Sequence, residues 1–184
     1  MIVGITGPKG AGKSTLLMGI TAALKARGLT VGGIISTRQN RNGERCGYEL
    51  LNLTRGEVEL LATFDEPSPE NAADYLQLCQ FYFSRQALRV GNEAILQGME
   101  ADCLIIDEIG FWEMSNGGWA DHLHLLKDRR KPILLGLRIG VAQDLFFRYG
   151  IELTRHIRLE MHDKESLHHL LLEEILHGLN SADN

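Results

Sequence analysis

Residues 1–14 read MIVGITGPKGAGKS, and the rest of the chain is organised around this stretch. Its first five residues are largely apolar and β-branched, which is typical of a buried strand. The pattern Gly-x-x-x-x-Gly-Lys-Ser follows at residues 7–14, and apolar residues take up helical spacing from near Thr15. A glycine-rich turn between a strand and a helix is the setting in which backbone N–H groups bind a phosphate chain. The sequence therefore predicts a nucleoside-triphosphate site here.

The residue types of this loop suit that chemistry. Its glycines let the backbone curl inward, and the following helix adds a partial positive charge at its N-terminus. Lys13 supplies a full charge for the β- and γ-phosphates, and Ser14 supplies a hydroxyl for Mg²⁺. Lys9 belongs to the loop, where we interpret it as a solvent-facing charge. The predicted nucleotide-binding residues are Gly7, Pro8, Lys9, Gly10, Ala11, Gly12, Lys13, Ser14 and Thr15.

The composition is that of a globular protein with a sizeable core. A length of 184 residues suggests one domain, spanning residues 1–184. Hydrophobic residues make up 44% and charged residues 23% of the chain, which is ordinary for a folded domain. The net charge of −5 argues against bulk nucleic-acid binding, although a local basic patch is compatible with it.

The cysteines and the hydropathy pattern favour a cytoplasmic protein. Cys46, Cys79 and Cys103 are far apart and odd in number, so neither a disulfide framework nor a zinc site is indicated. The N-terminal strand lacks the basic region of a signal peptide. No apolar run approaches the roughly 20 residues that span a bilayer. We therefore expect no membrane association.

A three-stranded antiparallel meander is expected early in the chain. The first helix should end at Gly28, and a strand should follow at residues 31–37. The pair Asn42-Gly43 is a strong hairpin signal, so residues 45–53 should return beside that strand. Residues 58–64 then form a third strand. We expect this meander to form a flap beside the nucleotide site.

The remaining elements alternate between apolar strands and amphipathic helices, separated by a polar loop at residues 65–70. Strands are expected at residues 80–83, 103–107, 132–137 and 156–159, and helices at residues 87–99, 119–128, 141–148 and 164–178. Such alternation indicates an α/β fold, with a mostly parallel sheet flanked by helices on both faces and the meander as an insertion. The glycine-rich loop assigns it to the P-loop NTPase class.

A second motif completes the predicted site. The apolar run Leu104-Ile105-Ile106 ends in Asp107 and Glu108, at the edge of a parallel sheet where such folds bind ligands. Asp107 fits the role of holding Mg²⁺ opposite Ser14. Glu108 can orient or deprotonate an attacking water, or serve as a loop or helix-capping carboxylate. The predicted catalytic residues are therefore Lys13 and Glu108, and the predicted metal ligands are Ser14 and Asp107. No Asn-Lys-x-Asp guanine signature is present.

With both motifs identified, the chain resembles the cancer-related or thermostable nucleoside-triphosphatases. The resemblance rests on the pair Gly32-Gly33, on residues 42–48 (NGERCGY) and on residues 106–114 (IDEIGFWEM). It implies slow, Mg²⁺-dependent hydrolysis of ATP, GTP and related triphosphates with low base specificity, on a RecA-like P-loop core. The phosphate-loop residues of the family correspond to Gly12, Lys13, Ser14 and Thr15, and its acidic pair to Asp107 and Glu108.

Two arginines are candidate substrate contacts. Arg138 follows the strand at residues 132–137, where family members tend to carry a basic or histidine-containing stretch. It can touch the γ-phosphate or lie on the surface. Arg45 can cross to the triphosphate from the hairpin, or pair with Glu49 or another neighbour on the adjacent strand.

Three further groups each allow two interpretations. Trp112 and Trp119 can stack on a base or cap the edge of the core. The histidines at 168, 169 and 177 face solvent if Leu167, Leu170, Leu171, Ile175 and Leu176 form the buried face, so a metal cluster is not favoured. The basic run at residues 129–131 can be a phosphate-binding lid or can complement the dipole of the preceding helix.

Three functions fit this pattern. The first is hydrolysis of the β–γ bond of a nucleoside triphosphate. The second is a kinase that passes the phosphoryl group to a nucleotide or small molecule, and the third is a nucleotide-binding accessory protein in cofactor biosynthesis. The poorly matching last third of the chain leaves room for a protein partner or activator.

Overall fold

The apolar runs form the strands of one mixed sheet within residues 1–182, which the computed structural model describes. The strands are β1 (Ile2–Thr6), β2 (Val31–Arg41), β3 (Glu44–Asn52), β4 (Val58–Thr63), β5 (Tyr75–Leu78), β6 (Phe81–Ser84), β7 (Cys103–Ile109), β8 (Ile133–Leu137) and β9 (Arg155–Arg158). The helices are α1 (Lys13–Lys25), α2 (Arg85–Gly98), α3 (Ala120–Leu123), α4 (Ala142–Tyr149) and α5 (Lys164–Ala182).

The sheet has a parallel part and an antiparallel part. Its order within the described residues is β5-β6-β4-β3-β2-β7-β8-β1-β9. The pairs from β2 to β9 are parallel, and those from β5 to β2 are antiparallel. This confirms the predicted α/β fold with an early meander. β8 lies between β1, which leads into the glycine-rich loop, and β7, which carries the two acidic residues.

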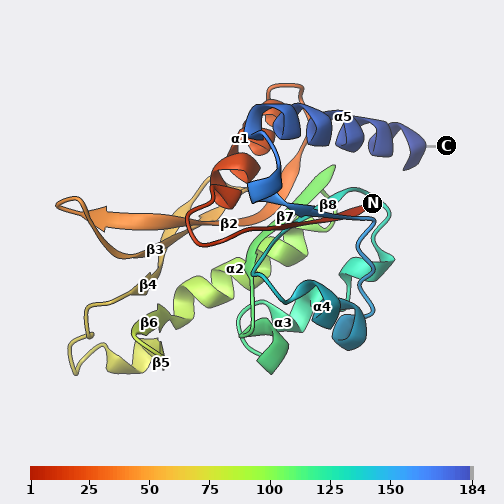
Figure 1. Ribbon diagram of the computed structural model, residues 1–184. Coiled ribbons are helices and arrows are strands. Elements are labelled where there is room, and N and C mark those ends of the chain that lie inside the picture. The colour runs from red at the N-terminus through yellow and green to blue at the C-terminus, as the bar shows by residue number, and fades with distance from the viewer. Residues whose placement is uncertain (183–184) are drawn as a thin grey trace.

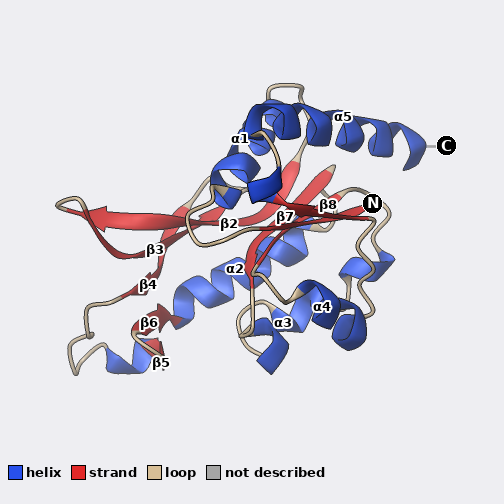
Figure 2. Ribbon diagram, in the orientation of Figure 1, coloured by secondary structure: helices blue, strands red, loops and turns tan. Residues whose placement is uncertain are grey.

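Helices cover both faces of the sheet. In Figures 1 and 2, α1 and α5 lie above it and α2, α3 and α4 lie below it. The central strand β7 accordingly buries side chains in both directions, as its continuous apolar run predicts. Cys103 and Ile105 join the core beneath α1 and α5, whereas Leu104 and Ile106 join the core beside α2, α3 and α4.

The β2–β3 hairpin is longer than expected. Asn42 and Gly43 form the predicted two-residue turn, with φ angles of 53° and 84°. However, β2 continues to Arg41 instead of ending at residue 37, because the polar residues 38–41 still pair with β3. The hairpin therefore projects beyond the helical layers, at the left of Figure 1.

Other boundaries also differ from those expected. α1 ends at Lys25, before Gly28. The strand β5 was not predicted. The expected helix at residues 119–128 is only α3 and a 3₁₀ turn (Leu126–Asp128). The N–H groups of Leu125 and Asp128 bond to carbonyls three residues back, which tightens the chain away from α-helical geometry.

The apolar face of α5 differs from the prediction at one leucine. Leu170 is 39% exposed, and Leu172 is buried in its place, so the predicted face is wrong there. His168 lies against Gly19 of α1, whereas His169 faces solvent, as expected, and lies 3.1 Å from Glu173. No group of three potential metal-binding side chains occurs among residues 1–182. In the same region, no helix combines the length and apolar character needed to cross a membrane.

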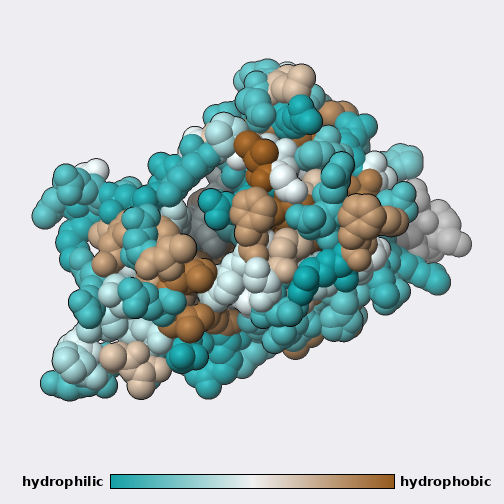
Figure 3. All heavy atoms as spheres, turned by 60° about the horizontal axis from the view of Figure 1, so that its bottom comes forward, coloured by the Kyte–Doolittle hydropathy of each residue, from teal (hydrophilic) through white to brown (hydrophobic). Residues whose placement is uncertain are grey.

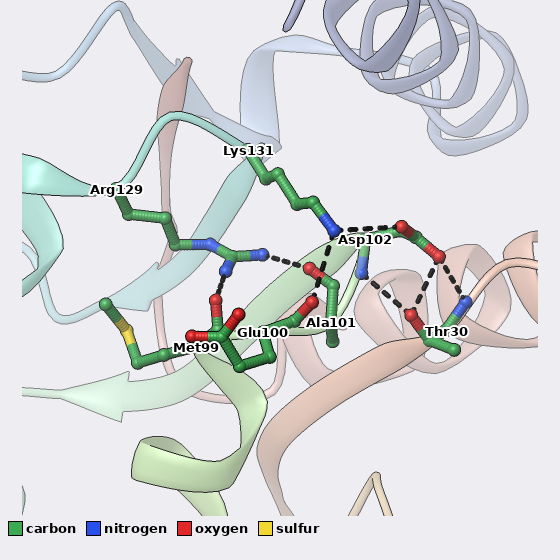
Figure 4. A network of polar contacts seen from close by, with 7 residues as sticks. All are labelled: Thr30, Met99, Glu100, Ala101, Asp102, Arg129 and Lys131. Carbon is green, nitrogen blue, oxygen red and sulfur yellow. Dashed lines mark hydrogen bonds and ion pairs between the residues drawn. The ribbon is translucent and has the colours of Figure 1, made fainter. Parts of the chain in front are cut away.

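A polar network fixes the edge of the sheet where β7 and β8 begin (Figure 4). Arg129 donates hydrogen bonds to the carbonyls of Met99 and Ala101, just after α2. Lys131 contacts Asp102 at 3.2 Å, and Asp102 accepts hydrogen bonds from the backbone N–H and the hydroxyl of Thr30. Since β1 and β8 are parallel, this edge is opposite to the glycine-rich loop. The lid interpretation is therefore wrong, and Arg129 complements the C-terminus of α2 instead of the helix that precedes it.

Arg129 has a structural role, so Arg129→Ala should lower stability without lowering catalysis. Loss of its two hydrogen bonds should reduce the free energy of unfolding by about 1–3 kcal/mol. Urea denaturation measures this change, and phosphate release from ATP measures the hydrolysis that the sequence predicts. Arg130→Ala is the matched control, because Arg130 is exposed. Equal stability of the two variants, or a loss of turnover confined to Arg129→Ala, would contradict this role.

Candidate active site

The glycine-rich loop joins β1 to α1 and wraps around the side chain of Lys13. Gly10 and Gly12 have φ angles of 87° and 98°, a left-handed conformation that residues with a Cβ rarely adopt. Lys13 is buried, and its Nζ donates a hydrogen bond to the Gly7 carbonyl at 3.3 Å. The same Nζ lies 4.0 Å from Glu108 Oε1. The predicted catalytic pair is thus brought together.

The predicted metal ligands also meet. Ser14 Oγ donates a hydrogen bond of 2.6 Å to Asp107 Oδ2, across the intervening strand β8. Asp107 passes directly over Gly136 of β8, where an added Cβ would lie 2.1 Å from Asp107 Oδ1. Only glycine leaves room for this carboxylate. Together, the hydroxyl and the carboxylate are oxygen donors of the kind that Mg²⁺ prefers.

The surroundings of Asp107 disfavour the ionised form of its carboxylate. It is fully buried, and burial raises its pKa to about 6, with a further contribution from the negative charge of Glu108. Hydrogen bonds from Ser14 and from the Glu108 N–H, together with the positive charge of Lys13, lower the pKa of Asp107 and offset part of this increase. A cation beside this carboxylate would therefore relieve an unfavourable charge.

Glu108 is turned away from Asp107 by an irregular backbone. Its φ angle is 60°, which is uncommon for a residue other than glycine, and the register between β7 and β8 shifts between Ile106 and Ile109. As a result the two adjacent carboxylates point in different directions. Asp107 is buried against Ser14, whereas Glu108 has a side chain that is 42% exposed. Its position suits a general base acting on a bound water.

Glu113 was missed by sequence reasoning. It is buried, and its carboxylate accepts hydrogen bonds from the Gly110 N–H at 2.7 Å and the Trp119 N–H at 3.4 Å. Burial raises its pKa, while these hydrogen bonds lower it. Its carbonyl accepts a hydrogen bond from the Tyr149 hydroxyl at 2.6 Å. Glu113 therefore holds the segment after β7 in place. Glu113 belongs to the segment at residues 106–114 that carries the family resemblance, but no role was predicted for it, since its partners are backbone groups.

Two further cations border the loop and were also missed. An added Cβ at Gly10 would lie 2.9 Å from Nη2 of Arg38 on β2, and one at Gly12 would lie 3.0 Å from Nζ of Lys164 at the start of α5. Both side chains come from elements far away in the sequence. Only the folded topology brings their charges to the phosphate loop.

The two candidate arginines occupy different places. Arg138 borders the same cavity as Lys13 and Glu108, and its guanidinium lies 5.9 Å from the Phe111 ring centroid. Arg45 instead donates a hydrogen bond to the Tyr48 hydroxyl and lies 5.0 Å from the ring centroid of Phe64. The structure thus brings Arg138, but not Arg45, together with the predicted catalytic pair.

A cavity of about 440 Å³ extends from the loop toward the meander. Pro8, Lys9 and Lys13 border one end of it, and aromatic side chains border the other: Tyr48, Phe81, Phe83, Phe111, Trp112 and Trp119. Figure 3 views the molecule from the side of α2, α3 and α4, where apolar residues reach the surface between polar margins. Lys9 is exposed, as expected, but its Nζ also lies 6.0 Å from the Tyr48 ring centroid.

The contact over Gly136 predicts that Gly136→Ala will damage the site. The new methyl group must displace the Asp107 carboxylate, and a shift of about 1 Å at a reacting centre can cost about 10²-fold in rate. Phosphate release at increasing Mg²⁺ concentration measures the loss. Gly178→Ala on α5 is the control, because its Cβ would meet only Pro132 Cγ, at 3.5 Å. Full activity of Gly136→Ala would mean that the position of Asp107 is not critical.

Comparison with known proteins agrees with this geometry. A family model described as NTPase matches residues 2–169. The nucleoside-triphosphatase THEP1 of Caldivirga maquilingensis is 31% identical over 98% of this chain and 95% of that protein. THEP1 of Methanocaldococcus jannaschii is 30% identical over 97% of this chain and 99% of that protein.

Two solved structures share the fold. A human cancer-related nucleoside triphosphatase has a TM-score of 0.66 at 22% identity, covering 97% of each chain. THEP1 from Aquifex aeolicus has a TM-score of 0.65 at 20% identity, covering 97% of this chain and 99% of that one. These two proteins therefore share the arrangement of the sheet and its helical layers with this chain, although their sequences are only 20–22% identical to it.

Proposed function

The chain belongs to the NTPase family and is a nucleoside-triphosphatase, and we propose that it cleaves the β–γ bond of ATP, GTP and related triphosphates with Mg²⁺. We further propose slow turnover with little preference for the base. One observation carries the proposal. The Ser14–Asp107 hydrogen bond of 2.6 Å joins the phosphate loop to the acidic pair, next to Lys13 and Glu108.

Some of the site residues bind the triphosphate and its metal ion, and others position the attacking water. Loop N–H groups and the start of α1 bind the phosphates, and Lys13 neutralises charge on the β- and γ-phosphates. Ser14 and Asp107 would hold Mg²⁺, which when bound offsets negative charge on the phosphate oxygens. Glu108 orients the attacking water and accepts its proton. Arg38 and Lys164 add positive charge beside the loop. Positioning and electrostatics supply most of such catalysis.

We expect little preference for the nucleotide base because of the side chains that border the glycine-rich loop. The side chains closest to Gly10 and Gly12 are the charged Arg38 and Lys164, which recognise phosphate oxygens and carry no information about the base. No guanine-binding motif accompanies them in the sequence. The binding energy should therefore come mainly from the triphosphate.

Phosphate release from ATP, GTP, CTP and UTP tests the proposal. The wild type should turn over all four within about tenfold of one another, and removal of Mg²⁺ with EDTA should abolish release. Lys13→Ala should lose at least about 10²-fold in turnover, because it removes a charge-stabilising group. Lys127→Ala, at an exposed position, is the control. Nucleotide binding without phosphate release would favour the accessory-protein alternative instead.

A further inference from the structure

If Glu108 activates the attacking group, as proposed, the cavity described above is on the attacking side of the γ-phosphate, because Glu108 borders it. In phosphoryl transfer the attacking and leaving oxygens are roughly in line. Lys13 and Glu108 border the cavity. The nucleoside diphosphate leaves on the side of the γ-phosphate opposite the base that activates the attacking group. A molecule in the cavity would therefore present its atoms where water attacks during hydrolysis.

A buried hydroxyl in the cavity wall has no partner. Ser36 of β2 borders the cavity and is 5% exposed, and its Oγ makes no hydrogen bond with any described residue. An unsatisfied buried hydroxyl is costly and rare in folded proteins. A ligand atom that accepts or donates a hydrogen bond there would remove this cost. Ser36 plays no part in the hydrolytic arrangement.

The remaining wall suits a flat ring. Phe83 packs against Trp112 with ring centroids 4.7 Å apart, and Phe81 lies 5.7 Å from Tyr48. Aromatic walls with a few polar groups are characteristic of small-molecule sites, which usually measure about 300–1,000 Å³. At about 440 Å³ the cavity is at the small end of this range, so it fits a molecule of one or two rings.

We propose that this cavity binds an uncharged heteroaromatic alcohol as a phosphoryl acceptor, with its ring lying against the aromatic wall and Ser36 hydrogen-bonded to a ring heteroatom. The acceptor hydroxyl oxygen attacks the γ-phosphorus, and the bond from that phosphorus to the β–γ bridging oxygen breaks. The hydroxyl proton passes to Glu108. The products are a phosphate monoester, a nucleoside diphosphate and one proton. Hydrolysis is then the same reaction with water as acceptor, so this inference rests on the proposed function.

Binding and transfer are tested separately on the full chain. The wild type with Mg²⁺ and the non-hydrolysable analogue AMP-PNP is titrated with 3-pyridinemethanol, 5-hydroxymethyluracil and uridine, and tryptophan fluorescence reports occupancy beside Trp112 and Trp119. In parallel, γ-³²P-ATP is supplied with each probe, and the label is separated into inorganic phosphate and phosphate ester. We expect at least one probe to quench fluorescence and to divert label into an ester, with the total ADP formed equal to the sum of ester and inorganic phosphate.

Ser36→Ala should weaken binding of the effective probe about tenfold and lower the ratio of ester to inorganic phosphate by a similar factor. Ser68→Ala, an exposed serine in the loop after β4, is the matched control and should change neither value. Absence of quenching by every probe in the AMP-PNP complex would overturn the inference and leave hydrolysis standing. Quenching with all label in inorganic phosphate would overturn the acceptor role. Failure to bind AMP-PNP would overturn the proposed function as well.

Discussion

Glu108→Gln is expected to bind nucleoside triphosphates normally and to hydrolyse them about 10²–10⁴-fold more slowly than the wild type. That range is typical for the loss of a general base. Glutamine keeps the size of the side chain and cannot accept the proton of water. Glu108 lies at the site with its side chain 42% exposed, so the substitution should cost little stability. Single-turnover phosphate release and equilibrium binding of the triphosphate measure the two effects.

The geometry around Glu108 makes this test specific. Its neighbour Asp107 is buried against Ser14 and cannot reach the cavity side, so no second carboxylate of the pair can replace it. Glu113 borders the cavity, but backbone N–H groups occupy both of its carboxylate oxygens. Glu70→Gln, in the exposed loop before β5, controls for the change of charge. Retention of more than about a tenth of wild-type turnover would assign the base to another group.

The sequence predicts the site residues that stand in short motifs, but it does not predict the contacts that depend on the order of the strands. Lys13, Ser14 and Asp107 were found because each stands in a short motif whose residue order reflects its chemistry. Strand order is a property of the whole sheet, so the sequence did not reveal that β8 separates the two motifs. The requirement for glycine at position 136 follows only from that order, since Asp107 passes over it.

The lining of the cavity was even harder to predict from the sequence. Ser36, Tyr48 and Phe81 lie on three different strands, and nothing in their spacing indicates that they share one wall. Trp112 and Trp119 allowed either a stacking role or a role at the edge of the core. In the structure Trp119 is in the core and also borders the cavity. Arg45 was one candidate substrate contact, but the fold shows it bonded to Tyr48 and not among the residues that line the cavity.

Asp107→Asn is expected to abolish Mg²⁺-dependent hydrolysis and at the same time to stabilise the metal-free protein near pH 7. Asparagine keeps the shape of the side chain and still pairs with Ser14, but it offers Mg²⁺ no negative charge. The stability change has the opposite sign because the wild-type carboxylate is fully buried and burial raises its pKa to about 6. A carboxyl whose pKa rises on folding contributes most stability when protonated, below its ordinary pKa. This contribution is lost as the pH rises through about 6.

The size of this effect follows from the raised pKa, since each unit corresponds to about 1.4 kcal/mol. We expect Asp107→Asn to gain about 1–3 kcal/mol in free energy of unfolding at pH 7.5 in EDTA, and to gain little at pH 4. The groups facing Asp107 are Glu108, which raises its pKa, and Lys13, which lowers it, and neither is changed. Urea denaturation between pH 4 and pH 8 measures the difference, with Asp121→Asn on the exposed surface of α3 as control. Added Mg²⁺ should stabilise the wild type and leave the variant unaffected. A variant less stable than the wild type at pH 7.5 in EDTA would mean that the Asp107 carboxylate supports the fold, and would contradict the destabilised carboxylate that the proposed metal-binding role requires.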